Sequence, residues 1–396
     1  MSADSLSSRI MVVVLILILF GLIVAGLLIS SPLGFALLLL IGGGLFVGWN
    51  RFLKAMGKPT TQVLFRRHHR LSMGVLLLCL LLFPILFTLV FKQTYWIHVA
   101  ALSGIYVCMA LGLNIVVGLA GLLDLGYIAF YAIGAYSSAL VSVHFEQWWV
   151  LWLMIPISMM AAGTFGVILG APTLRLRGDY LAIVTLGFGE IIRIVLNNWN
   201  SVTNGPIGIA GIPYPRVFGF DFGKGINIAG AYFNETTLFY FLIVGLAFGI
   251  AGVARRLDRS RIGRAWRAIR EDELAARSMG INTRNMKLLA FASGASFAGV
   301  SGLVFAHMST FIEPNSFIFM ESAFVLCMVV LGGMGSIPGV ILGAILLTVL
   351  PEKFRDFQDY RMLVLGASLI VMMRLRPDGL LPRPRETAES LAAESP

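Results

Sequence analysis

Long apolar stretches recur along this chain and constrain its fold more than any other feature. A helix needs about 20 apolar residues to cross a bilayer, and about twelve windows approach that length. The windows are residues 11–30, 33–49, 74–91, 98–118, 122–143, 150–171, 180–197, 237–254, 288–308, 319–335, 337–351 and 361–374. Because 58% of the residues are hydrophobic and only 13% are charged, the composition excludes an ordinary soluble domain. The sequence therefore predicts an all-α polytopic integral membrane protein with about 10–12 transmembrane helices.

The positive charges gather in a few loops between these windows. Lysine and arginine outnumber aspartate and glutamate by 30 to 20, and the largest basic segment runs from Arg255 to Lys287. Smaller clusters lie from Arg51 to Arg70 and at Arg175 and Arg177, whereas the loop 198–236 is poor in positive charge. Loops rich in lysine and arginine face the cytoplasm. We therefore expect the basic clusters inside, the loop 198–236 outside and both termini in the cytoplasm.

Within the largest basic segment, an amphipathic helix precedes an acidic run. Ile262, Trp266 and Ile269 recur at i, i+4 and i+7, which gives a helix one apolar face among arginines and is typical of a helix at the membrane surface. That interpretation leaves the acidic run unexplained. Acidic residues favour a helix N-terminus and glycine favours a C-cap, so we expect a second, short helix there. The residues through which this predicted helix would contact a partner are Glu271, Asp272, Glu273, Ala275, Ala276 and Gly280.

Ionisable side chains inside the apolar windows are further candidates, because an uncompensated charge in a bilayer costs about 2.5–3.5 kcal/mol. They are Asp124, Glu190, Arg193 and Glu321. Glu190 and Arg193 are three residues apart and share one helix face, so they form either a structural ion pair or, with Thr185, a polar lining of a path through the bundle. Asp124 lies in a glycine-broken stretch, where we expect it first to cap freed backbone amides and otherwise to face such a path.

Two glycine clusters mark places where helices can break. The candidate breaks are Gly121, Gly126, Gly332, Gly333 and Gly335. Interrupted helices in corresponding places of two halves mark the pathway in repeat-built transporters, and the halves here would be roughly 98–197 and 237–374. Close helix packing through small residues is the alternative. Both interpretations stay open, and so does the number of re-entrant segments.

Catalytic signatures are absent from the sequence. There is no Gly-x-x-x-x-Gly-Lys-Ser/Thr loop for phosphate, so we do not expect this chain to hydrolyse ATP. No set of residues has the spacing of a metal site or of an activated nucleophile. We expect no catalytic residues, no bound metal and no cofactor held by this chain.

Several longer motifs occur in order along the chain. They are Leu174 to Arg193, Gly205 to Ile209, Gly263 to Glu273, Glu321 to Ser336 and Arg376 to Pro382. Together they resemble the LivM-type permease family of high-affinity branched-chain amino acid ABC importers. The segment from Glu273 to Gly280 also resembles the Glu-Ala-Ala…Gly loop by which ABC permeases contact their ATPase, with one extra residue after the glutamate.

The resemblance implies a permease subunit of a binding-protein-dependent importer in the bacterial inner membrane, which translocates leucine, isoleucine and valine by ATP-driven alternating access. Its partners would be a LivH-type permease, two ABC ATPases that hydrolyse the ATP, a periplasmic amino acid-binding protein and membrane lipid, without nucleic acid. The implied domains are an N-terminal two-helix extension with a basic loop in residues 1–72, a permease core in residues 73–376 and a cytoplasmic tail in residues 377–396.

Two alternatives remain. Related permeases share these motifs, so the same architecture is compatible with import of other amino acids, amides or urea. A stand-alone membrane carrier or a membrane enzyme is the alternative from another class, and an enzyme would need a convergent catalytic constellation, which the sequence lacks.

Overall fold

The computed structural model describes most of the apolar part of the chain. The described residues are 3–28, 69–91, 94–145, 150–173, 176, 178–217, 220–228, 231–353, 366–367, 370, 374 and 379–381. The predicted window 33–49, nearly all of the window 361–374, the basic residues at 51–67, 175 and 177, and the tail after 381 lie outside this description.

The chain divides into two compact units. The first comprises residues 1–97 with 352–358, and the second comprises residues 98–351 with 359–396. In the first unit, α1 (Ala3–Leu28) packs against α4 (His69–Leu89), with Ile16 and Cys79 buried between them. The ammonium of Lys353 donates to the carbonyl of Leu27 at 2.7 Å, which fixes the end of α1 within this unit.

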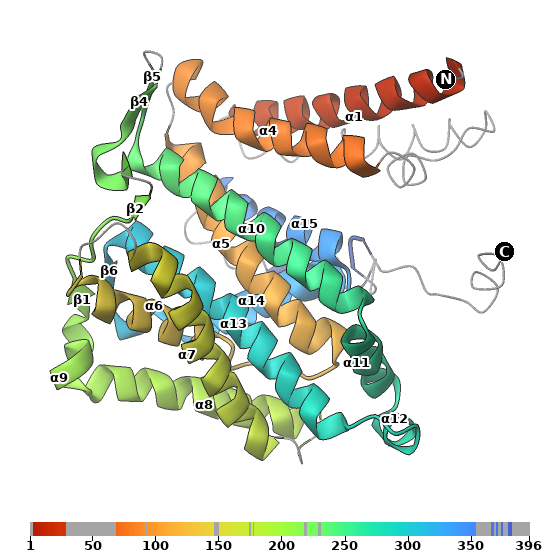
Figure 1. Ribbon diagram of the computed structural model, residues 1–396, viewed down its shortest axis with the longest axis vertical. Coiled ribbons are helices and arrows are strands. Elements are labelled where there is room, and N and C mark those ends of the chain that lie inside the picture. Colours follow the sequence, from red (N-terminus) through yellow and green to blue (C-terminus); the bar gives the residue numbers. More distant parts are fainter. Residues whose placement is uncertain are drawn as a thin grey trace. The chain divides into compact units, whose positions relative to one another are not determined.

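The second unit is a bundle of helices around α13 (Figure 1). Its helices are α5 (Tyr95–Leu113), η1 (Asn114–Leu119), α6 (Ile128–Ser142), α7 (Val150–Thr173), α8 (Asp179–Asn198), α9 (Asn200–Thr203), α10 (Glu235–Arg259), α11 (Arg261–Glu271), α12 (Glu273–Ser278), α13 (Thr283–Ser309), α14 (Phe319–Gly332) and α15 (Ile337–Lys353). Helix α13 packs most closely against α7 and α6. Small residues such as Gly299 let its backbone approach its neighbours, as is usual between membrane helices.

Within the described residues, five helices are long and apolar enough to cross a membrane. They cover Tyr95–Leu119, Val150–Thr173, Glu235–Arg259, Thr283–Ser309 and Pro314–Gly332. The shorter helices α6 and α15 occupy the predicted windows 122–143 and 337–351, and α8 occupies the window 180–197. The predicted all-α architecture is therefore found in every described window.

Short strands collect at one end of the second unit. Strand β1 (Ile209–Ala210) pairs with β6 (Phe311–Ile312), and two hairpins are formed by β2 (Arg216–Val217) with β3 (Phe220–Asp221) and by β4 (Ile226–Ile228) with β5 (Ala231–Phe233). Figure 1 shows β4 and β5 at the start of α10, and α11 and α12 at its other end. The β1–β6 pair joins the loop 198–236 to the turn after α13, so these two segments lie on the same side of the bundle.

Both glycine clusters interrupt helices. Helix α5 ends in the π-helical stretch η1, and residues 120–127 are not helical, so α6 begins at Ile128 rather than at the predicted residue 122. Helix α14 ends at Gly332, and four residues separate it from α15, which begins at Ile337. Non-helical backbone at membrane depth requires cover by protein, and Asp124 and Tyr127 in the first break are fully buried.

Candidate functional site

Helix α11 lies against the bundle by its apolar face. Ser260 caps its first turn, because its hydroxyl accepts a bond from the Gly263 amide at 3.3 Å. The indole N–H of Trp266 donates to the carbonyl of Met286 at 2.7 Å, and Trp266 and Ile269 are both buried in the protein. The structure thus corrects the membrane-surface interpretation of this helix, since the two residues pack against protein instead of presenting an apolar face to lipid.

Helix α12 is short and capped at both ends. The Asp272 carboxylate accepts bonds from the amides of Leu274 and Ala275 at 2.8 and 3.1 Å, which makes Asp272 the N-cap. Gly280 follows the last turn with φ of +83°, and the Ile281 amide donates to the Ala276 carbonyl at 3.1 Å. Glycine tolerates this left-handed conformation, which is common directly after a helix.

The expected second helix begins later than the acidic run suggested. Glu271 is the last residue of α11, and Asp272 separates the two helices. The sequence-based placement of Glu271 in the second helix was therefore wrong, because the cap formed by Asp272 sets the start of α12 at Glu273.

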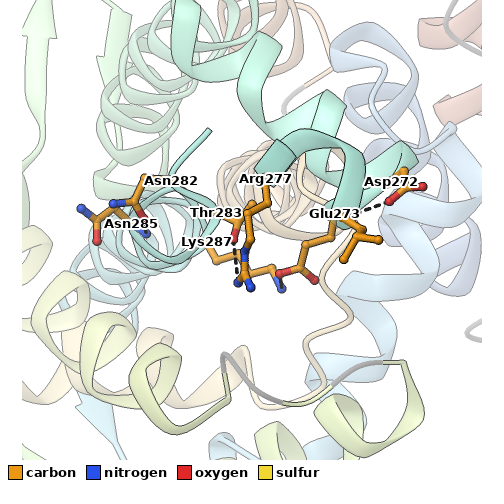
Figure 2. Close-up of polar contacts among 8 residues, drawn as sticks. Asp272, Glu273, Arg277, Asn282, Thr283, Asn285 and Lys287 are labelled. Carbon is orange, nitrogen blue, oxygen red and sulfur yellow. Dashed lines mark hydrogen bonds and ion pairs between the residues drawn. The ribbon is translucent and has the colours of Figure 1, made fainter. Parts of the chain in front are cut away.

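A buried ion pair ties α12 to the first turns of α13. The Lys287 ammonium lies 2.7 Å from the Glu273 carboxylate, and the two side chains are only 6% and 19% exposed. Arg277 adds a longer bond of 3.4 Å to the hydroxyl of Thr283. Figure 2 shows Glu273 and Arg277 extending from α12 toward Thr283 and Lys287. Helix α12 is therefore fixed to α13 by side chains as well as by the connecting chain.

The opposite face of α12 carries exposed apolar side chains. Leu274 is 70% exposed and Met279 is 83% exposed, whereas Ala276 is buried. Ala275 is also exposed. Basic residues surround this helix in the sequence, so it lies in the part of the chain that we expect in water. Exposed apolar groups grouped at such a place are typical of a protein contact.

Asp124 and Thr185 are brought together at the first break. Asp124 accepts the Gly126 amide at 2.9 Å, and the Leu125 amide donates to the Thr185 hydroxyl at 3.0 Å. Asp124 therefore acts as a structural cap, as its glycine-rich surroundings predict. Thr185, which belongs to α8, supplies a second acceptor, and its bond to Leu125 holds the broken segment against that helix.

Glu190 and Arg193 form the predicted ion pair one to two turns further along α8. The guanidinium lies 2.8 Å from the carboxylate, and the side chains remain 33% and 31% exposed. Ile183, Ile191 and Ile194 form an exposed apolar stripe on α8 beside this pair. The helix thus presents an apolar face with one polar edge. Its role in a translocation path stays a prediction.

Glu321 also has a partner, which the sequence did not suggest. The hydroxyl of Tyr106 donates to its carboxylate at 2.8 Å, between residues 215 positions apart. This bond joins α5 to the first turn of α14. The bond gives the Glu321 carboxylate a hydrogen-bond donor inside the bundle.

A cavity of about 310 Å³ opens beside the short strands. Its polar wall includes the Arg216–Asp221 pair at 3.4 Å and Lys224, and its apolar wall includes Phe145 and Leu151. The buried ring of His307 lies at this cavity and is within 2.9 Å of the Pro213 carbonyl. Residues of the loop 198–236 therefore help to line a cavity that has both polar and apolar walls.

Two hydrogen bonds connect α11 to η1 and η1 to the second glycine break. The guanidinium of Arg270 donates to the carbonyl of Gly118 at the end of η1, and the Gly335 amide donates to the Asn114 side chain at 2.8 Å. Sequence reasoning missed Arg270, Asn114 and Lys287 as site residues. Their partners lie far along the chain or on another helix, and the only local signal was a basic residue beside an acidic run.

Comparison with known proteins agrees with this arrangement. Residues 95–373 match the family described as "Branched-chain amino acid transport system / permease component". The high-affinity branched-chain amino acid transport system permease protein LivM of Escherichia coli K12 is 49% identical over 301 residues, which cover 73% of this chain and 70% of that protein.

More distant relatives match a similar share of the chain. The permease protein LivH of Salmonella typhimurium is 28% identical over 301 residues, or 72% of this chain and 93% of that protein. The permease protein BraD of Pseudomonas aeruginosa is 30% identical over 295 residues, or 70% and 92%. No solved structure matches this chain.

Proposed function

Because this chain belongs to the permease component family of branched-chain amino acid transport systems, we propose that it is the membrane subunit of an ATP-driven importer of leucine, isoleucine and valine. It would lie in the bacterial inner membrane with both termini in the cytoplasm. It would be paired there with a LivH-type permease and served by two ABC ATPases and a periplasmic binding protein. ATP would be hydrolysed by the ATPases.

The observation that carries this proposal is the geometry of α12. Exposed Leu274 of α12, with Met279 directly after the helix, offers an apolar contact to a partner in water, while Glu273 is paired with Lys287. Because one face of α12 is exposed and the other is bonded to α13, a partner that displaces α12 would also displace α13. We therefore assign the residues Asp272 to Gly280, with Glu271 at the end of α11, to the contact with the ATPases.

The proposed mechanism is alternating access. Closure of the ATPase dimer on ATP would displace α12, and the buried pair would carry that displacement into α13, the central helix of the bundle. Since α13 packs against α6 and α7, movement of α13 would shift these helices together. The path would then open outward to the binding protein and, after hydrolysis, inward.

Two surfaces are candidates, one for docking of the binding protein and one for passage of the substrate. The cavity beside the short strands, with Arg216, Asp221 and Lys224 in its wall, is where we expect the binding protein to dock. The polar edge of α8, with Glu190 and Arg193, suits a water-filled path better than lipid, because an ion pair that is about one third exposed is costly in hydrocarbon. A zwitterionic amino acid has both charges that this edge can meet. Asp124 and Thr185 would shape the same path by fixing the broken segment.

The cargo is open to a second interpretation. Import of other amino acids, amides or urea is compatible with the same architecture, because the binding protein would select the substrate. A panel of labelled leucine, isoleucine, valine, glutamine and urea, each offered with the cognate binding protein, separates these cargoes.

Affinity purification from native membranes tests the assembly. We expect a tagged form of this chain, extracted in mild detergent, to recover a second permease and two ATPase subunits identified by mass spectrometry. Recovery of this chain alone, under conditions that keep another ABC importer assembled, would contradict the proposal. The purified complex in proteoliposomes should then take up labelled leucine only with ATP and binding protein present.

A further inference from the structure

Three segments that are distant in sequence meet beside the last turn of α11. The guanidinium of Arg270 donates to the carbonyl of Gly118, 152 residues away, in the last turn of η1. Asn114, in the first turn of η1, accepts the amide of Gly335 at 2.8 Å. The α11 helix, the first glycine break and the second glycine break are therefore joined by two hydrogen bonds.

The glycines at this junction leave room for Arg270. A Cβ atom at Gly121, where φ is +70°, would lie 2.8 Å from the Arg270 Cγ. A Cβ atom at Gly335, where φ is +85°, would lie 3.5 Å from the Arg270 guanidinium and 3.3 Å from the Gly118 carbonyl. The positive φ angles and the close approach both favour glycine here. One arginine thus fits between the two breaks.

The chemistry of this contact favours an arginine. The last carbonyls of a helix have no partner within the helix, and a positive side chain near them is stabilising. The guanidinium is a planar fork of donors at the end of a long stem, whereas the ammonium of lysine is a compact point charge. A carbonyl does not neutralise the charge of Arg270, which agrees with the exposure of this residue to water.

Arg270 also lies directly beside the proposed contact with the ATPases. Only Glu271 separates it from Asp272, the N-cap of α12. A displacement of α12 therefore reaches two places: α13 through Lys287, and the end of η1 through Arg270. The second route leads to the two segments where the helices are already interrupted.

We propose that Arg270 is a positioning residue that couples movement of α12 to both glycine breaks. Its bond to Gly118 moves the end of η1, and the Asn114–Gly335 bond moves the second break with it. The two non-helical segments then move together. This inference rests on the proposed function, because it assigns a route for the force that the ATPases would supply.

The test uses the complete importer in proteoliposomes and measures amino acid taken up per ATP hydrolysed. R270Q removes the charge and shortens the donor, so we expect normal assembly, continued ATP hydrolysis and a fall of about tenfold in that ratio, as for the loss of a charge-assisted hydrogen bond. R270K should restore part of the ratio. Equal ratios in R270Q and the wild type would overturn the inference.

R264Q is the charge-matched comparison. Arg264 lies on the same helix and donates to the carbonyl of Arg259 at 3.3 Å, so its replacement leaves the Gly118 bond intact. We expect a ratio near that of the wild type. An equal fall in R264Q and R270Q would mean that only the positive charge of α11 matters, and would overturn the route through Gly118.

N114A tests the second bond and serves if R270Q fails to assemble. If both bonds belong to one route, R270Q with N114A should reduce the ratio no further than the larger single effect. Effects that multiply would overturn a shared route. A wild-type complex without ATP-dependent uptake would instead refute the proposed function itself, whatever the variants do.

Discussion

Two ion pairs of this protein have nearly equal lengths but very different surroundings. Glu190 and Arg193 lie 2.8 Å apart on α8 and are about one third exposed. Glu273 and Lys287 lie 2.7 Å apart and are 19% and 6% exposed. The first pair joins two residues of one helix, whereas the second joins α12 to α13.

Exposure and location determine what each ion pair can contribute to stability and to movement. A pair within one helix stabilises that helix by a few tenths of a kcal/mol and cannot transfer movement between elements. A buried pair between two helices fixes their relative position, since separating the charges leaves one of them without a partner in a poorly solvated place. We therefore expect the α12–α13 pair to be sensitive to mutation and the α8 pair to be tolerant.

The largest effect is expected from breaking the α12–α13 pair. K287M keeps most of the apolar stem but leaves the Glu273 carboxylate without its ammonium partner, which should cost about 3 kcal/mol of unfolding free energy. Equilibrium unfolding of the purified chain in mixed micelles measures this loss. Uptake per ATP should fall in the same variant, because α12 would move without α13.

The double variant K287M with E273Q provides the control. Replacing both charges removes the buried carboxylate that has lost the Lys287 ammonium, so part of the stability should return. Uptake should stay low, since the tie between the helices is still missing. Full uptake in the double variant would show that the pair stabilises the fold without taking part in transport.

A smaller effect is expected from G280A. The alanine Cβ would meet no atom within 4 Å, so the cost arises only from φ of +83° and should be about 1 kcal/mol. G245A is the matched control, because Gly245 lies inside α10 with equally open space around its Cβ. Reduced uptake in G280A with normal uptake in G245A is the expected result. Normal uptake in both would remove the end of α12 from the mechanism.

The smallest effect on stability is expected at the α8 pair. E190Q and R193Q should each cost less than about 1 kcal/mol if water reaches this edge, and the double variant should cost no more than the sum. The same unfolding measurement applies. Losses of several kcal/mol in the single variants, relieved in the double variant, would place the pair in a water-free environment.

Local features of the sequence predicted much of the fold. Apolar length located the helices, because crossing a bilayer sets a minimum run of apolar residues. The spacing of Glu190 and Arg193 predicted their pair, and Gly280 predicted the end of the short helix. Each of these depends on neighbours within one or two turns.

Other features depend on contacts between distant parts of the chain. The sequence placed Trp266 at the membrane surface, because periodicity shows that a face is apolar but not what covers it; the structure places it against Met286. The partner of Glu273 lies on the next long helix, and that of Arg270 lies in η1. Neither spacing nor composition can supply such partners.

The most direct test of the account is a cross-link from the exposed face of α12. A thiol-reactive photo-crosslinker would be attached to L274C in the assembled importer, with I207C on the strand-rich side as control, since Leu274 and Ile207 are 70% and 73% exposed. The account predicts that L274C links to an ATPase subunit with a yield that changes on ATP binding, and that I207C does not. Labelling of the ATPase from I207C, or from neither position, would contradict it.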